Sequence, residues 1–165
     1  STVITLSPTK QLILANTFHS YLMWQANDDN SNHEIKTGYP EVWKELTEVR
    51  EKGAISSDSI HQAIYAKVPY GFLYAYNPEN FTARGKKPYP NSFNSKLYYQ
   101  MVGKDGDFIV GNDIGNFDFR KQLKDLKMPV LVIGGRYDRV ATPEMMVKYN
   151  YKNRFSFWFN FNDDN

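Results

Sequence analysis

The stretch that decides the fold is PVLVIGGRYDRVATP, residues 129–143. Its apolar run, 130–133, stands between a proline and a pair of glycines, and such a short run is typical of a strand buried in a parallel sheet. Asp138 follows on the turn just beyond this strand, where open α/β sheets place functional side chains. Asp138 is therefore a candidate catalytic acid that would orient a histidine. Taken from spacing alone, the pattern favours a turn or cap residue ahead of Thr142 and the helix that begins at Pro143.

A second strand candidate, QLILANTF at 11–18, lies far upstream. Its four consecutive apolar residues suit a strand that is covered on both faces. A long helical insertion between two buried strands allows a crossover, so we expect strands near 11–17 and 129–134 to lie parallel in one sheet. The sequence therefore predicts an α/β fold with a helical middle at about 20–127.

Amphipathic spacing predicts the helices of that middle region. They are expected at 39–53, 56–68, 91–103 and 118–127. Ser57 is the expected cap of the second helix, and Phe93, Leu97 and Met101 form the expected apolar stripe of the third.

Two polar stretches are predicted to be loops. NPENFTARGKKPYPNS, at 77–92, carries three prolines and a glycine and is typical of an irregular connection. NDDNSNHE, at 27–34, begins like a calcium-binding loop, but His33 stands where such a loop requires glycine. The second stretch is therefore predicted to be a polar loop without a metal.

The composition excludes several classes of function. A net charge of +2 is too small to favour nucleic acid or an anionic membrane as a partner, and no apolar run is long enough to span a bilayer. The absence of cysteine excludes disulfides and thiolate chemistry and, with no secretory signal in STVITLSPTK, favours a cytoplasmic location. Nucleotide-binding glycine patterns are incomplete, and His19, His33 and His61 lack metal-ligand spacing. We expect no metal and no cofactor, place these histidines on the surface or in loops, and leave the oligomeric state open.

The segment DFRKQLKDLKMPVLVIGGRYDRVATP resembles the part of α/β-hydrolases in which a helix, a strand and a GxxDxxxP turn carry the acid of the catalytic triad. Upstream, LILANTF, NHEIKTGYPEVWKEL, VPYGFLYAYNP and KLYYQMVGKDGDFIVGND resemble the strand that enters the helical cap and the cap itself. Within the superfamily, the similarity is closest to proline iminopeptidases and related serine aminopeptidases.

The resemblance implies a partial α/β-hydrolase fold with a helical cap and a few parallel strands. Its domains would be an N-terminal segment with a core strand at 1–18, the cap at 19–117, a core helix, acid-bearing strand and following helix at 118–150, and an atypical aromatic and Asn-rich tail at 151–165.

Two site residues follow from the resemblance. Asp138 matches the triad acid, which holds the catalytic histidine in its correct tautomer. Asp107, in GKDGDF, falls near the cap carboxylate that binds the substrate's free ammonium group, although a role as an exposed loop acid stays open. Many such peptidases carry a second acid directly after the triad aspartate, and Arg139 stands there instead.

The sequence also departs from this family. It contains no GxSxG nucleophile motif and no histidine after His61, where the family places its catalytic histidine downstream of the acid. Two hypotheses follow. The chain is an incomplete serine aminopeptidase that acts on a small peptide or amino-acid amide if a companion chain completes it. Alternatively, it is a non-catalytic module that binds a ligand or a protein. In either case we expect the isolated chain to be inactive.

Overall fold

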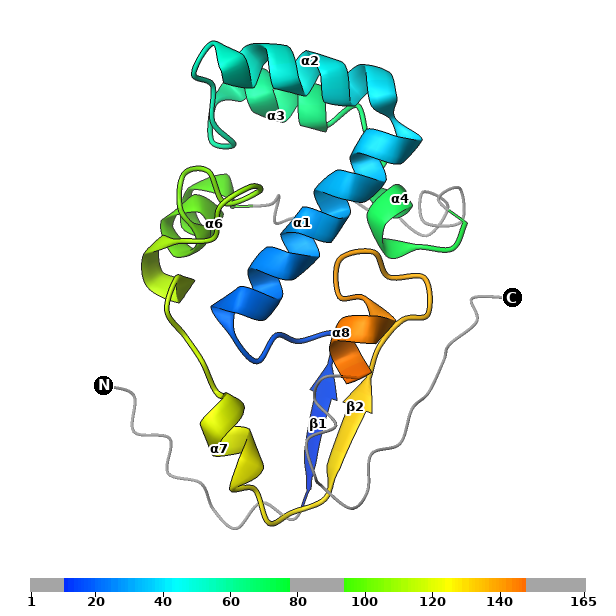
Figure 1. Cartoon of the computed structure of the whole chain (residues 1–165), viewed down its shortest axis with the longest axis vertical. Helices are drawn as coiled ribbons and strands as arrows, with labels where there is room; N and C mark the ends of the chain where they lie inside the picture. Colours follow the sequence, from blue (N-terminus) through cyan, green and yellow to red (C-terminus); the bar gives the residue numbers. More distant parts are fainter. Residues whose placement is uncertain (1–10, 78–93, 148–165) are drawn as a thin grey trace.

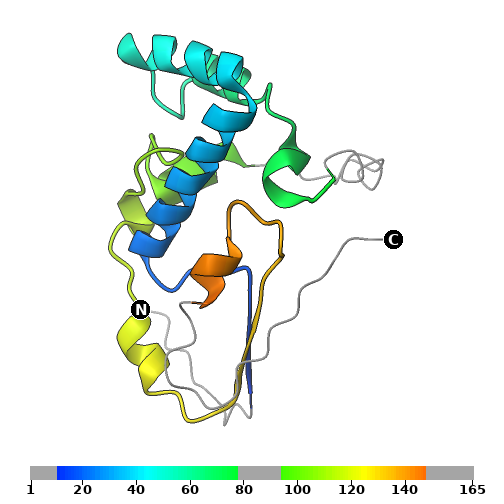
Figure 2. The same cartoon turned by 45° about the vertical axis from the view of Figure 1, so that its right-hand side comes forward.

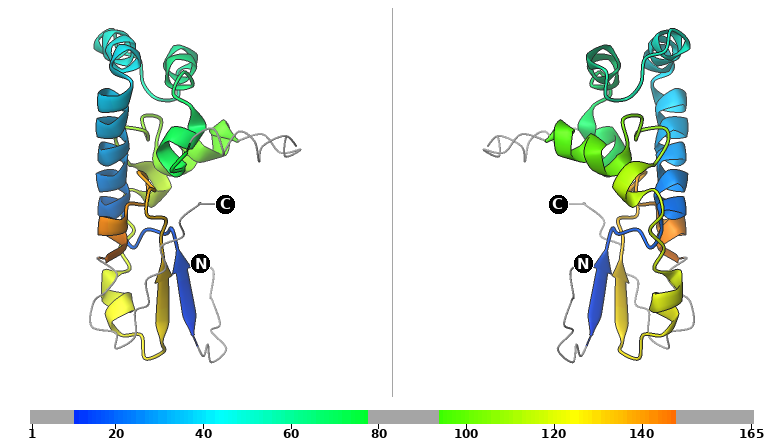
Figure 3. Two further views of the ribbon diagram at one scale, coloured as in Figure 1. Left: turned by 90° about the vertical axis from the view of Figure 1, so that its right-hand side faces the viewer. Right: turned by 90° about the vertical axis from the view of Figure 1, so that its left-hand side faces the viewer.

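The computed structural model of the chain describes residues 11–77 and 94–147. A small sheet forms one end of the molecule, and helices gather at the other end (Figure 1, Figure 3). In chain order, the elements are β1 (Leu12–Ala15), α1 (Tyr21–Gly38), α2 (Pro40–Glu51), α3 (Ser59–Tyr65), α4 (Tyr70–Tyr74), α6 (Ser95–Val102), the 3-10 helix η1 (Asn112–Ile114), α7 (Arg120–Lys124), β2 (Val130–Ile133) and α8 (Pro143–Val147). The predicted mixed α/β fold with a helical middle is confirmed.

The two strands pair in parallel, as predicted. Leu12 lies opposite Val130, and the register continues to Ala15 opposite Ile133. Both strands are shorter than predicted. β1 ends before Asn16, which adopts a positive φ of 45°. A helical insertion thus carries the chain from one strand to its parallel neighbour.

The prediction that the upstream strand is covered on both faces is wrong for the described chain. Leu12 and Leu14 pack against the core, whereas Ile13, on the opposite face of β1, is 56% exposed. Successive side chains of a strand point to opposite faces, and only one face of β1 meets other described residues. That core consists of Met23, Val130, Val132, Ala141 and Met146, and it joins the sheet to α1 and α8.

The polar stretch 27–34 is not a loop but the middle of α1, which corrects the sequence prediction. Ser20 caps this helix by accepting a hydrogen bond from the Met23 N–H at 3.3 Å. Within the helix, the side chains of Asn27 and Ser31 donate to carbonyls one turn earlier, at 2.7 and 2.9 Å. Asn30 and Asn32 donate to the carbonyls of Arg139 and Asp107, both at 2.8 Å. These polar residues are tolerated in the helix because distant segments accept their hydrogen bonds.

The cap of the second predicted helix differs by one residue. Asp58, not Ser57, precedes α3, and its carboxylate accepts the N–H of Ile55 at 2.9 Å. The N–H of Ser57 instead donates to the Lys104 carbonyl at 2.8 Å. Ser57 therefore holds the loop after α6 rather than the start of α3.

The prediction that Leu97 and Met101 form the buried stripe of the helix at 91–103 is wrong, because both side chains are exposed. Leu97 is 52% exposed on α6, whereas Val102 is fully buried; Phe93 lies outside the described residues. The helix packs on the side of Val102 because the chain folds back there, with the Gly111 N–H donating to the Val102 carbonyl at 2.7 Å. The last predicted helix, 118–127, is helical only over α7.

One of the three histidines contradicts the prediction, because His61 is completely buried within α3. His19 lies in the bend before α1, as the prediction allows, although it is only 7% exposed, and His33 is exposed as expected. No helix in the described ranges, 11–77 and 94–147, is long and apolar enough to cross a membrane.

Candidate functional site

The turn that carries Asp138 is held by close packing after β2. Gly134 lies so near Met146 that a Cβ there would come within 2.8 Å of the Met146 Cγ. The chain then bends around its own carboxylate: Asp138 Oδ1 accepts the N–H groups of Val140 at 2.9 Å and Ala141 at 2.7 Å. The direction of the carboxylate is therefore set by the backbone of the turn.

The other oxygen of Asp138, Oδ2, has no hydrogen-bond partner among the described residues, and none of their histidines contacts it. Burial raises the pKa of Asp138, and the two backbone hydrogen bonds partly oppose that rise. The next N–H group of the turn, that of Thr142, does not bond to Asp138 but donates to Asn27 Oδ1 at 3.2 Å.

Arg139, which stands where many such peptidases carry a second acid, joins the turn to the cap. Its guanidinium donates to Glu34 Oε2 at 3.0 Å and to the Phe72 carbonyl at 2.6 Å. Its backbone N–H donates to the Leu73 carbonyl at 2.9 Å, and its own carbonyl accepts from Asn30 Nδ2 at 2.8 Å. The guanidinium of Arg139 is therefore bonded to α1 and α4, and it does not neutralise the charge of Asp138.

Asp107 lies in the loop between α6 and η1, and its carboxylate is largely enclosed. The hydroxyl of Tyr98 donates to Oδ1 at 3.3 Å. The single proton of the Tyr99 hydroxyl is shared between Oδ2, at 3.4 Å, and the closer carbonyl of Ser56, at 2.8 Å. On the backbone, the Asp107 N–H donates to Ser56 Oγ at 3.3 Å, and Asn32 Nδ2 donates to the Asp107 carbonyl at 2.8 Å. Burial raises the pKa of Asp107, and the two tyrosine hydroxyls work against it. The open alternative of an exposed loop acid does not hold.

Asp28, on α1, is the second carboxylate of this cap cluster. Burial raises its pKa to about 8, and the negative charges of Asp107 and Asp29 add to the rise, while a hydrogen bond with Trp24 opposes it. Its buried Oδ2 has no hydrogen-bond partner in the described part of the chain. Burial therefore favours the protonated form of Asp28, and a nearby cation would favour the ionised form of both carboxylates.

Asp105, two residues before Asp107, has the opposite surroundings. Arg50 donates to both of its oxygens, at 2.7 and 2.8 Å, and Ser56 donates through its N–H at 3.0 Å and its hydroxyl at 2.9 Å. Burial favours a higher pKa for Asp105, but the hydrogen bonds from Arg50 and Ser56 outweigh it and lower the pKa. Gly106 separates the two aspartates, and a Cβ there would lie 2.1 Å from Val102 Cγ2, so this loop packs directly on α6.

The structure does not bring Asp107 and Asp138 into contact. Asn30 of α1 is bonded to the Asp138 turn and Asn32 to the Asp107 loop, so the two segments contact different sides of this helix. Figure 1 and Figure 2 show the two segments on either side of this helix. The roles assigned to these aspartates from the sequence stay predictions.

The sequence analysis missed Asp28, Asp105 and the buried His61. Asp28 was hidden because 27–34 was interpreted as a loop. With α1 as a helix, Gln25, Asp28 and Asn32 follow an i, i+3, i+7 pattern, which is the signal that would have placed them on one side. No group of three metal-binding side chains occurs within 11–77 and 94–147.

Comparison with known proteins identifies the fold. No protein-family model and no curated protein sequence matches the chain. Among solved structures, it is similar to VinJ, with a TM-score of 0.58 and 18% identity, and to proline iminopeptidase from Mycobacterium smegmatis, with a TM-score of 0.56 and 20% identity. Both are α/β-hydrolase fold proteins. The chain has a partial α/β-hydrolase fold. The matches cover 90% and 91% of this chain but 48% of each of the others, so it spans about half their length.

Proposed function

We propose that this chain is the cap and acid-bearing part of a serine aminopeptidase of the proline iminopeptidase type, which releases N-terminal residues from small peptides in the cytoplasm. The observation that carries the proposal is the setting of Asp138. One carboxylate oxygen is bonded by the turn, which leaves Oδ2 for the imidazole of a catalytic histidine. In this role Asp138 fixes the histidine tautomer and stabilises the imidazolium.

The rest of the machinery has to come from other residues. The sequence has no GxSxG motif and no histidine after His61, so the nucleophile, the oxyanion donors and the base lie outside these 165 residues. On this proposal the isolated chain binds but does not turn over its substrate. Neither a metal, a cofactor, a nucleic acid nor a membrane takes part.

The cap cluster supplies a site for the substrate's ammonium group. Asp107 and Asp28 are two enclosed carboxylates without a cationic partner among the described residues, and each has a raised pKa. A bound ammonium removes the repulsion between them and lowers both pKa values, so binding is coupled to loss of the Asp28 proton. Acetylation of the substrate amine abolishes this attraction.

The test supplies the missing part as a companion chain that carries a GxSxG motif and a late histidine. Prolyl and alanyl chromogenic amides are the substrates, and a serine-directed covalent probe labels the nucleophile. We expect turnover only when both chains are present, and Asp138→Asn lowers kcat by roughly a thousandfold or more because the histidine loses its orienting acid. Asp113→Asn, at an exposed position of η1, is the matched control. Unchanged turnover in the Asp138 variant contradicts the proposal.

A second candidate function, a non-catalytic binding module, is favoured by one observation. The Asp138 turn and the Asp107 loop bond to different residues of α1, Asn30 and Asn32, so the cap cluster holds an ammonium group without Asp138. Calorimetry measures the affinity of the isolated chain for L-prolinamide and for N-acetyl-L-prolinamide, and thereby tests the ammonium site apart from catalysis. Two results together favour the binding module. The free amine binds to the parent chain but not to Asp107→Asn, and the assembled two-chain enzyme stays inactive.

A further inference from the structure

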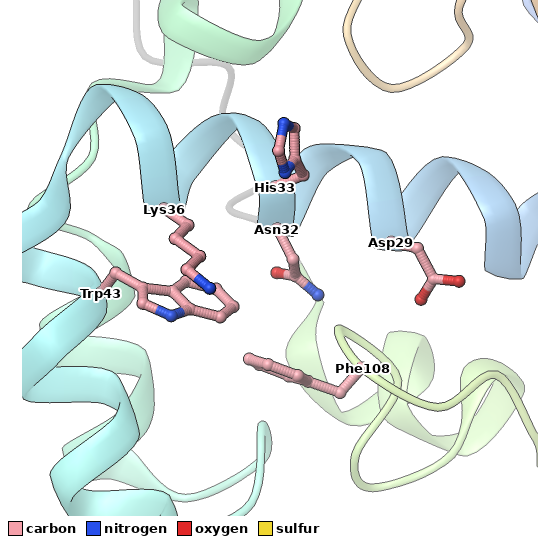
Figure 4. Close-up of a pocket in the computed structure, with 6 residues that line it drawn as sticks. All are labelled: Asp29, Asn32, His33, Lys36, Trp43 and Phe108. Carbon is pink, nitrogen blue, oxygen red and sulfur yellow. The ribbon is translucent and has the colours of Figure 1, made fainter.

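A cavity of about 320 Å³ lies on the cap, between α1, α2 and the loop that precedes η1. This aromatic pocket is lined by Asp29, Asn32, His33, Lys36, Trp43 and Phe108 (Figure 4). Its volume is at the lower end of the range for small-ligand sites. Its α1 residues are spaced i, i+3, i+4 and i+7, and therefore lie along one stripe of the helix.

The aromatic pocket is separate from the Asp138 turn. Neighbouring α1 residues advance by about 100°, which puts the pocket stripe on the side of the helix away from Asn27, whose Oδ1 accepts the Thr142 N–H of the turn. In Figure 4, Asn32 points from α1 toward Phe108, and Lys36 extends from the same helix over Trp43. A ligand in this pocket does not compete with one at the Asp138 turn.

Two aromatic rings form the apolar wall of the pocket. The Trp43 and Phe108 ring centroids are 5.9 Å apart, and the rings are inclined by 31°. The guanidinium of Arg50 lies 3.6 Å from the Phe108 centroid and holds that ring in place. Such a pair offers a planar ligand group a rigid contact surface at little cost in conformational entropy.

Two polar groups on α1 lack partners in the described part of the chain. Asn32 is 7% exposed, and the bond from its Nδ2 to the Asp107 carbonyl identifies Oδ1 as the free acceptor, which has no hydrogen bond. In Figure 4, this oxygen faces the side of Trp43 and Lys36. The Lys36 ammonium forms no ion pair with the described residues. An unsatisfied buried acceptor is costly, so a ligand that donates an N–H to Asn32 gains binding energy.

We propose that the aromatic pocket binds the C-terminal residue of a peptide whose last side chain is aromatic. The terminal carboxylate pairs with Lys36, the amide N–H of the same residue donates to Asn32 Oδ1, and the ring packs on Trp43 and Phe108. Asn32 and Lys36 are one helical turn apart, about 5–6 Å between Cβ atoms, which suits the short separation of N–H and carboxylate within one residue. Asp29, at the other end of the stripe, repels a carboxylate and so sets the direction of the peptide.

The inference goes beyond the proposed function, because it concerns the opposite end of a peptide from the one bound by Asp107. The probes are N-acetyl-L-phenylalanine, its amide, and 3-phenylpropionate, which lacks the N–H donor. Binding is followed by the NMR resonance of the Trp43 indole N–H, assigned with Trp43→Phe. We expect a Kd of about 1 mM for N-acetyl-L-phenylalanine and about tenfold weaker binding of the other two.

Two variants isolate the charge. Lys36→Met weakens binding of N-acetyl-L-phenylalanine about tenfold but leaves binding of its amide unchanged. Lys44→Met, at an exposed position on α2, changes neither, and Asp107→Asn leaves both intact, which separates this site from the ammonium site. Equal affinity for acid and amide, an unchanged affinity in Lys36→Met, or no movement of the Trp43 resonance at about 10 mM probe overturns the proposal.

Discussion

Asp105 and Asp107 are two residues apart in one loop, yet their carboxylates have opposite surroundings. Asp105 is paired with Arg50 and bonded by Ser56, and its pKa is lowered. Asp107 is bonded by two tyrosine hydroxyls and lies near Asp28, and its pKa is raised. The first carboxylate has a cation within the chain, and the second has none among the described residues.

This difference separates a structural carboxylate from a candidate binding one. An enclosed carboxylate with a cation and several donors holds elements together, and here Asp105 joins α2, the start of α3 and the loop after α6. An enclosed pair of carboxylates without a cation destabilises the fold. Ionisable groups with pKa values perturbed in this way cluster at functional sites. Three measurements test the comparison.

The largest effect is expected at the Asp105 side of the loop. Arg50→Met leaves Asp105 enclosed without its cation and removes the contact with Phe108, so we expect a loss of about 2–3 kcal/mol in the free energy of unfolding by urea. Lys67→Met, which breaks the exposed pair with Glu45, is the control and costs less than about 0.5 kcal/mol. An equal loss of unfolding free energy in the two variants would mean that the Asp105 network stabilises the fold no more than an exposed ion pair does.

The next effect is an increase in the free energy of unfolding, and it concerns Asp28, the neighbour of Asp107. The pKa of Asp28 is about 8 in the folded chain and near 3.8 in an unfolded one. Between these values the folded state binds the extra proton, so the contribution of Asp28 to stability falls as the pH rises from about 4 to about 8. We expect Asp28→Asn to stabilise the chain by roughly 1–3 kcal/mol at pH 8 and to change little at pH 4.

Urea unfolding at several pH values measures this difference. Asp113→Asn, which removes an exposed carboxylate, should leave the pH profile of the parent chain unchanged. A destabilised Asp28→Asn chain at pH 8 would show that the carboxylate is compensated after all and would remove the basis for a cation site.

The smallest effect extends the comparison to Asp138. Both hydrogen bonds of the turn go to Oδ1, which asparagine retains, so Asp138→Asn should change the thermal midpoint very little. Asp138→Ala loses both bonds and should cost about 1 kcal/mol. A clear drop in Asp138→Asn as well would mean that the charge itself stabilises the turn, in which case Asp138 is primarily structural.

The Asp138 turn could be predicted from the sequence because its interactions are local. A short apolar strand, two glycines, an aspartate, and Thr142 with Pro143 follow one another within fifteen residues, and the turn and the helix start that they predict are both present. The parallel pairing of the strands was predictable for a related reason, since an apolar strand on each side of a helical insertion leaves few other arrangements. The 27–34 stretch was not predictable, because its polar residues become helical only through bonds to distant segments, such as Asn30 to the Arg139 carbonyl.

The sequence by itself determined the Asp138 turn and the start of α8, whose stabilising contacts lie within a few residues, and it marked both strands by their short apolar runs. Only the tertiary structure decided which carboxylates lie together. Arg50 and Asp105 are 55 positions apart, and Asp28 and Asp107 are even further apart. Burial raises the pKa of Asp28 and Asp107 adds to the rise, whereas Arg50 and Ser56 lower the pKa of Asp105. The physical reason is that the charge state of a carboxylate depends on burial and on neighbouring charges in space, and residue spacing along the chain specifies neither.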